Sequence, residues 1–178
     1  LDGPALLAFP TDRDAYSRLS ALLTRGNLRA EKGKCFLYKQ DVYEFKEGAI
    51  FVVIPPDKLN ERFEYDRDFL DSVEEYKRQF DRFYVAASRT YCGDDAKRLY
   101  RISLIGVPMV ATGDVYYHEA GSRKLQDVLT CIREKCTIYT AGYRLYPNAE
   151  RHLKCSKEQH RLFQQNPEAI DNTIVITK

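Results

Sequence analysis

The sequence predicts an α/β protein with a parallel sheet covered by helices. Four short apolar runs, at 5–9, 49–54, 83–88 and 107–112, alternate with stretches of helical periodicity. Each run is almost continuously apolar rather than alternating, which is typical of parallel strands buried on both faces. The order strand–helix repeated four times also indicates a parallel sheet built from β/α units.

The first half of the chain contains the first three strands. The run 5–9 is closed by Pro10, and we expect Thr11 to cap a helix that ends at Gly26. The strand 49–54 is stopped by two prolines, and the strand 83–88 is followed by polar residues and Gly93. Helical patterns are predicted over 40–45 and 68–80, and the apolar stripe of the first helix is expected to be Tyr16, Leu19, Leu22 and Leu23.

The second half is predicted to be mostly helical. Asp94 or Asp95 opens a helix whose stripe is Leu99, Ile102 and Ile105, and Gly106 follows it. After the strand 107–112 we expect a helix over 122–133 and a short turn near 140–142. Ser156 is predicted to cap a helix reaching about residue 164, and Pro167 begins a last helix or turn.

Composition bounds the class of protein. The chain has 178 residues, 44% of them hydrophobic, and a net charge of +2. This balance gives no global field for nucleic acid or an anionic membrane, although a local patch is compatible with it. No apolar run reaches the length of a membrane span, and no signal peptide is visible. The five cysteines have no zinc-site spacing, so we expect reduced thiols.

Four β/α units are too few to close a barrel, which needs about seven or eight strands. The alternatives are a small open sheet or part of a larger barrel. The chain begins at Leu1 rather than at a methionine and almost at once enters a strand. We therefore favour the second alternative and expect a preceding segment.

The rest of the sequence is organised around the stretch 107–118, in which the apolar strand ends in Thr-Gly and is followed by Asp114, two tyrosines and His118. Functional side chains gather at the carboxyl ends of parallel strands, so Asp114 stands where a ligand or catalyst would be expected. His152 and His160 lack a carboxylate at ligand spacing and are predicted to be exposed. His118, two residues past Tyr116, is predicted to be a surface residue, with metal ligation as the alternative. No P-loop, Gly-x-Gly-x-x-Gly or Ser-His-Asp pattern is present.

The strings Val110-Ala111-Thr112-Gly113-Asp114-Val115-Tyr116-Tyr117-His118, Leu125-Gln126-Asp127-Val128-Leu129-Thr130-Cys131-Ile132-Arg133 and Pro147-Asn148-Ala149-Glu150-Arg151-His152-Leu153 carry a resemblance. They resemble the polymerase-and-histidinol-phosphatase (PHP) domain of bacterial C-family DNA polymerases, which are the DNA polymerase III α subunits and their error-prone relatives. The second and third strings look most like the error-prone branch.

The resemblance implies an incomplete four-strand portion of a distorted (β/α)7 barrel over residues 1–155. Residues 156–178 would be a helical exit segment toward the polymerase core. In intact relatives, zinc or manganese is held by His, Asp and Glu at the strand ends, and the polymerase itself uses Mg²⁺. The first ligands of that cluster come from strands that this chain lacks.

At the remaining family positions, this chain has Thr90 in place of a histidine and reads Asp114-Val115-Tyr116 in place of Asp-x-His. A hydroxyl and a phenol are poor replacements for histidine as ligands of zinc or manganese. We therefore expect a degenerate remnant site at Thr90, Asp114 and Tyr116, with no catalytic residue, no bound metal and no cofactor in this segment.

Two functions remain open. The first is a structural and interaction module of a DNA polymerase, inactive by itself; the second is a metal-dependent phosphoesterase or 3′–5′ exonuclease domain of the same polymerase. An unrelated small α/β binding protein is a third alternative. The resemblance implies a cytoplasmic protein that contacts DNA through the full-length polymerase, with other polymerase subunits as further candidate partners and no membrane partner. Two interpretations of Arg123, Lys124 and Arg133 stay open, an approach to DNA and simple solvent exposure. An open sheet edge is expected to cause self-association or to be masked by a loop.

Overall fold

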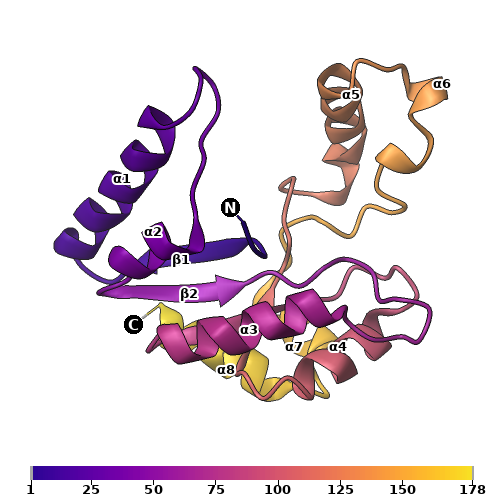
Figure 1. Cartoon of the computed structure of the whole chain (residues 1–178). Helices are drawn as coiled ribbons and strands as arrows, with labels where there is room; N and C mark the ends of the chain where they lie inside the picture. The colour runs from indigo at the N-terminus through magenta and orange to yellow at the C-terminus, as the bar shows by residue number, and fades with distance from the viewer. Residues whose placement is uncertain (1, 178) are drawn as a thin grey trace.

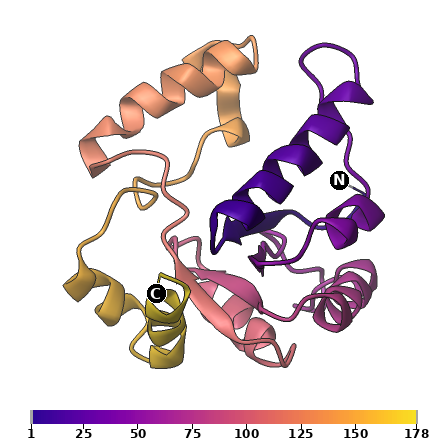
Figure 2. The same cartoon turned by 90° about the vertical axis from the view of Figure 1, so that its left-hand side faces the viewer.

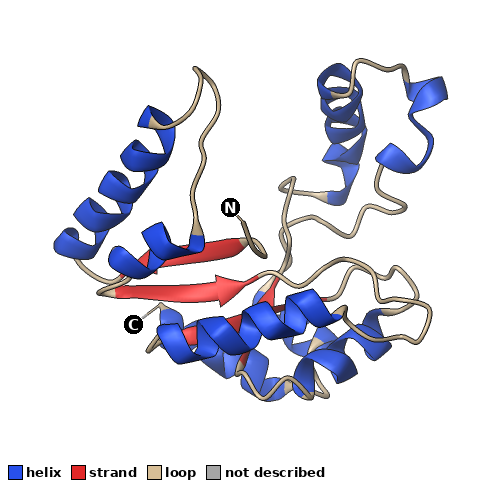
Figure 3. Cartoon of the chain, in the orientation of Figure 1, coloured by secondary structure: helices blue, strands red, loops and turns tan. Residues whose placement is uncertain are grey.

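The computed structural model describes residues 2–177 and shows one four-stranded sheet with helices around it (Figures 1 and 3). The strands are β1 (Leu6–Pro10), β2 (Ala49–Val53), β3 (Phe83–Ser88) and β4 (Met109–Thr112). The helices are α1 (Arg13–Leu28), α2 (Lys39–Glu44), α3 (Arg67–Gln79), α4 (Asp95–Ser103), α5 (Arg123–Arg133), α6 (Ile138–Ala141), α7 (Ser156–Leu162) and α8 (Pro167–Ile176), with 3₁₀ turns η1 (Ala120–Ser122) and η2 (Gly142–Arg144).

The sheet is mixed, which corrects the prediction of four parallel strands. Its order is β1-β2-β3-β4; β2, β3 and β4 are parallel, but β1 pairs with β2 in antiparallel orientation. The α/β class and the four strand positions are confirmed. The barrel that the resemblance implies stays a prediction.

The direction of β1 follows from the path of the connection to β2. A parallel pair needs a crossover that returns the chain to the opposite end of the sheet. Here α1 leads away from the sheet and the segment 29–38 runs back along it, with the Phe36 amide donating to the Gly26 carbonyl at 3.1 Å. The chain therefore re-enters the sheet where it left, and the Thr11 amide donates to the Gly48 carbonyl at 3.0 Å. β1 and β2 form a hairpin with a helical insertion.

The start of α1 and its buried face differ from the predictions. Asp12, not Thr11, is the N-cap, and its carboxylate accepts from the Ala15 amide at 2.7 Å. The buried face is Ala15, Leu22 and Gly26, while the predicted Tyr16 and Leu23 are exposed. Gly26 does not end the helix, which continues to Leu28. Its missing side chain instead leaves room for the returning segment to pack against the helix. A Cβ there would lie 2.6 Å from the Cys35 sulfur.

The core lies on one face of the sheet. Alternate residues of the strands, such as Phe51, Val53 and Val85, pack against α3, α4, α7 and α8, as their period of two requires. Residues from all four helices are buried in this one cluster: Phe69, Val73, Tyr76, Leu99, Ile102, Leu162 and Ala169. The intervening residues Val52, Ala86 and Val110 form a smaller cluster on the opposite face, against which Ile176 packs.

Helix α8 covers the outer edge of β4, as Figure 2 shows for the C-terminal part of the chain. Asn172 donates to the Met109 carbonyl at 2.7 Å and Thr173 to the Ala111 carbonyl at 3.3 Å. These side chains replace the pairing that another strand would supply. Helix α7 begins at Ser156, but its N-cap is Cys155 and not Ser156 as predicted. The proposed boundary between residues 155 and 156 stays a prediction.

Helices α5 and α6 stand apart from the sheet (Figure 1). The stripe Leu125, Val128, Leu129 and Ile132 lies on one face of α5, and its members are between 45% and 69% exposed. This spacing of three and four residues is that of a face made for packing.

Among the described residues, no helix is long and apolar enough to cross a membrane. All five cysteines are free.

Candidate functional site

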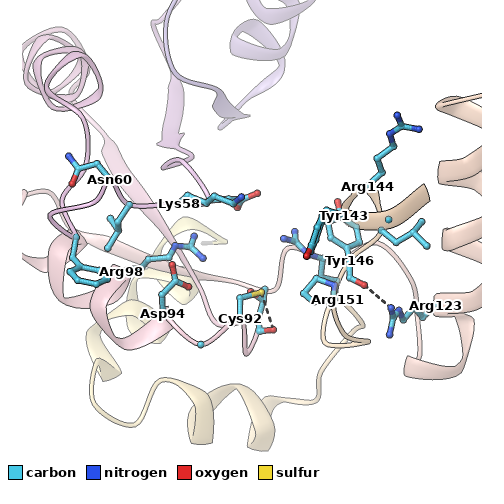
Figure 4. Close-up of a pocket in the computed structure, with 18 residues that line it drawn as sticks. Lys58, Asn60, Cys92, Asp94, Arg98, Arg123, Tyr143, Arg144, Tyr146 and Arg151 are labelled. Atoms are coloured by element: carbon cyan, nitrogen blue, oxygen red, sulfur yellow. Dashed lines mark hydrogen bonds between the residues drawn. The ribbon is translucent and has the colours of Figure 1, made fainter. Parts of the chain in front are cut away.

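The segments that follow the carboxyl ends of β2 and β3 line one pocket of about 1010 Å³ (Figure 4). The rest of its lining comes from the start of α4, from Arg123 at the start of α5, and from the segment 142–151 after α6. Thr90, which follows β3, belongs to the lining. The lining residues of this pocket that carry charge are Asp57, Lys58, Asp94, Arg98, Arg123, Arg144 and Arg151.

Asp114 lies two residues after the end of β4 and has a left-handed backbone, with φ of 44°. Its carboxylate forms an ion pair with the guanidinium of Arg151. The Arg151 side chain is 10% exposed and that of Asp114 is 35% exposed. The partner of Asp114 is therefore an arginine from a distant segment of the chain.

Backbone pairing brings Arg151 to this place. The segment after α6 returns beside the exit of β4, where the Tyr116 amide donates to the Arg151 carbonyl at 2.9 Å and the Leu153 amide to the Tyr117 carbonyl at 3.1 Å. Asn148 ties the same segment to the exit of β3 by donating to the Thr90 carbonyl at 2.7 Å. The segment 145–155 therefore closes the site across two strand ends.

Two tyrosines complete the surroundings of Arg151. Its guanidinium lies 4.1 Å from the centre of the Tyr146 ring, and the rings of Tyr116 and Tyr146 are 5.0 Å apart. Burial, followed by the hydrogen bond with Tyr116, raises the pKa of the Tyr146 phenol. Burial also lowers the pKa of Arg151, but a guanidinium starts so high that it remains charged at neutral pH. Tyr116 is thus a packing partner of the ion pair.

Thr90 is 2% exposed and is held by its neighbours. Its amide and that of Tyr91 donate to the Asp95 carboxylate at 3.1 and 2.7 Å. Its hydroxyl lies 3.3 Å from the Cys92 sulfur. Asp95 is 6% exposed, and its second oxygen has no hydrogen-bond partner. Thr90 and Asp95 together fix the turn that leads from β3 into α4.

The residues present do not fit a catalytic metal. A cation beside Asp114 would meet the positive charge of Arg151, and neither Thr90 nor Tyr116 offers a nitrogen or carboxylate ligand. In the described part of the chain, no three His, Cys, Asp or Glu side chains lie close enough together to hold a metal ion. That this segment works without a metal stays a prediction.

The three histidines do not converge. His118 is exposed beside Glu119, His152 contacts the Ala149 carbonyl through Nδ1 at 2.8 Å, and His160 contacts the Ser156 carbonyl at 2.7 Å. Of the basic residues considered for DNA, Arg123 lines the pocket, where it donates to the Tyr146 carbonyl at 2.7 Å. Lys124 and Arg133 are not part of the lining.

Sequence reasoning missed Lys58, Arg98, Tyr146 and Arg151 as residues of the site. The sequence does contain a signal for Arg98. Asp95 and Arg98 lie four residues before Leu99 and Ile102, respectively, and so share their buried face of α4, yet both are charged. Charged residues on a buried helix face indicate a functional or structural role. Arg151 has no comparable signal, because its partner is distant in the sequence.

Comparison with known proteins shows what the chain is related to. No family model matches it. Over its whole length it is 44% identical to a protein of Caulobacter vibrioides, of which it covers 16%. Over 98% of its length it is 42% identical to one of Bradyrhizobium sp., of which it covers 15%. Over 99% it is 38% identical to one of Agrobacterium fabrum, of which it covers 16%.

All three relatives are DNA polymerases, so the chain is homologous to part of a DNA polymerase. More narrowly, each of them is an error-prone DNA polymerase. The chain spans about a sixth of their length. The resemblance to the error-prone branch is confirmed, whereas the assignment to the PHP domain stays a prediction.

Proposed function

We propose that the chain is a segment of the PHP domain of a bacterial error-prone DNA polymerase and acts there as a non-catalytic structural and interaction module. The observation that carries the non-catalytic part is the ion pair of Asp114 with Arg151. A PHP-type phosphoesterase needs adjacent metals to activate water and to neutralise phosphate oxygens. Asp114 is the one ligand position that this chain retains, and the positive charge of Arg151 beside it opposes the binding of metal cations there.

The exposed stripe of α5 supports the interaction part of the proposal. Leu125, Leu129 and Ile132 form an apolar face that α6 leaves uncovered. Such a face on a helix that stands apart from the core is typical of a contact surface. Because the relatives are about six times longer than this chain, we assign the face to the remainder of the polymerase, through which the module would also reach DNA.

Catalytic assays test the proposal. The purified chain is expected to release no nucleotides from single-stranded DNA and to extend no primer, with or without Mn²⁺ and Mg²⁺. Asp114→Asn is the matched control for a metal-dependent reaction. Manganese-stimulated nucleotide release that this substitution abolishes would instead establish the exonuclease alternative.

The interaction part has its own test. Leu129→Glu with Ile132→Glu removes the apolar face without touching the core, because both side chains are more than half exposed. We expect the double variant to lose binding to the remainder of the polymerase while its thermal unfolding is unchanged. Binding equal to that of the unmodified chain would show that α5 is not the contact surface.

A further inference from the structure

The pocket at the strand ends is positively charged. Five basic residues line it, against the acidic residues Asp57 and Asp94. Two of the five have carboxylate partners outside the lining, since Arg151 pairs with Asp114 and Arg123 lies 3.6 Å from Asp127. Lys58, Arg98 and Arg144 supply charge for which the described residues provide no ion pair.

Arg98 is the most unusual of these residues. It is 5% exposed, and its Nε atom has no hydrogen-bond partner among the described residues. Arg101 on the same helix pairs with Glu64 at 3.3 Å, whereas Arg98 forms no such pair within residues 2–177. A buried cation without a counter-ion is costly. The Tyr65 phenol lies beside Arg98, and the carboxylates of Asp57 and Asp94 line the same pocket without forming an ion pair with it. The guanidinium is therefore available to a further negative group in the pocket.

Arg98 and Arg151 lie on opposite sides of the same pocket, one on α4 and the other in the returning segment (Figure 4). Both are buried, at 5% and 8% exposure. Burial lowers the pKa of Arg151 most, and the nearby Asp57 and Cys92 raise it by more than the positive charge of Arg98 lowers it. Because the two guanidinium groups face each other across the pocket, an anion between them would contact both.

We propose that this pocket binds a phosphate group, with Arg98 as its principal ligand and Lys58 and Arg151 on the other sides. One guanidinium group can donate two parallel hydrogen bonds to two oxygens of a phosphate. Several such cations around one pocket suit a doubly charged tetrahedral anion better than they suit a single carboxylate. The pocket is larger than a free phosphate, and the side chain of Tyr143 at its rim is fully exposed. A nucleotide therefore also fits as the source of the phosphate, with its base stacked on Tyr143. Binding requires neither a metal nor catalysis, so the inference is independent of the proposed function.

Thermal unfolding of the full chain in a buffer without phosphate tests the proposal. Added inorganic phosphate is expected to raise Tm saturably, by about 5 to 10 °C at a hundredfold excess over Kd, and sodium chloride of equal ionic strength is not. Arg98→Met is expected to abolish this rise. Without phosphate its Tm should equal or exceed that of the unmodified chain, because an apolar side chain replaces an unpaired buried charge.

Two further variants keep the test decisive even if Arg98→Met does not fold. Lys58 is exposed, so Lys58→Gln is expected to fold normally and to raise the half-saturating phosphate concentration about fivefold. Arg13→Gln on α1 removes one positive charge from an exposed position outside the pocket and should keep the full response. An equal response to phosphate in the unmodified chain, Lys58→Gln and Arg98→Met would overturn the proposal, as would an equal effect of chloride.

The source of the phosphate follows from a second titration, with a deoxynucleoside 5′-monophosphate. Saturation at a lower concentration than inorganic phosphate, with the advantage lost in Tyr143→Ala, identifies a nucleotide. Equal saturation identifies free phosphate. Both results support a site centred on Arg98, and the absence of any response to either ligand refutes it.

Discussion

Replacing Asp114 by asparagine is expected to destabilise the fold by breaking the ion pair with Arg151. Asparagine is the appropriate replacement because residue 114 has a φ of 44°, and Asn tolerates this left-handed conformation nearly as well as Asp. The substitution therefore removes the charge without adding backbone strain. It leaves the Arg151 guanidinium, whose side chain is 10% exposed, without its carboxylate.

The expected magnitude lies between two limits. Breaking a fully buried pair costs about 3–5 kcal/mol, and a surface pair contributes about 0–1 kcal/mol. Because the Asp114 side chain is 35% exposed, solvent screens the pair in part. We expect a loss of about 2 kcal/mol of unfolding free energy, which corresponds to a fall in Tm of about 4–8 °C for a chain of this size.

Urea unfolding followed by circular dichroism measures this loss. Asp71→Asn is the matched control, because Asp71 forms a pair with Arg67 at 3.7 Å in which both side chains are largely exposed, 88% for Arg67 and 69% for Asp71. The control should cost less than about 0.5 kcal/mol. An Asp114→Asn variant as stable as Asp71→Asn would refute the view that the ion pair holds the remnant site together.

Two more predictions concern the insertion between β1 and β2. Asp41 accepts from Arg29 at 2.6 Å, and this bond, followed by one from the Tyr38 amide, lowers the pKa of its carboxyl group. Because the pKa of Asp41 is lower in the folded state, its carboxylate stabilises the fold at pH values above the unfolded-state pKa of about 3.9. The Tm of the unmodified chain should therefore exceed that of Asp41→Asn at pH 6, and this difference should narrow progressively below pH 4. A constant difference in Tm from pH 6 to pH 2.5 would contradict this. Gly26→Ala should lower stability by about 1 kcal/mol in urea unfolding, because the clash with Cys35 and Leu37 exceeds the gain in helix propensity; a more stable variant would show that the returning segment moves aside.

The sequence predicted the strands well because buried parallel strands combine an apolar run with a clear stop. The strand 83–88 was predicted with the bounds that β3 has, and 49–54 differs from β2 by one residue. The direction of β1 could not be predicted in the same way. It depends on the segment 29–38 returning along α1, and this contact requires Gly26, Cys35 and Leu37 to meet in space.

For the candidate site, the sequence located the strand ends but not what lies across from them. Asp114 follows β4 and Thr90 follows β3, as their positions after apolar runs predicted. Arg151 and Arg98 join them only through tertiary structure, one by backbone pairing with Tyr116 and the other by its place on α4. Local periodicity carries no information about such pairings between distant segments.

Manganese binding to the unmodified chain is the most direct measurement of the central claim, that Arg151 rather than a metal holds Asp114. Mn²⁺ is preferable to zinc because it favours oxygen and nitrogen ligands, so the free cysteines interfere little. Titration followed by electron paramagnetic resonance is expected to show no stoichiometric site with a Kd below about 1 µM, consistent with the weak O-ligand set that remains. A stoichiometric submicromolar site that disappears in Asp114→Asn would contradict the account.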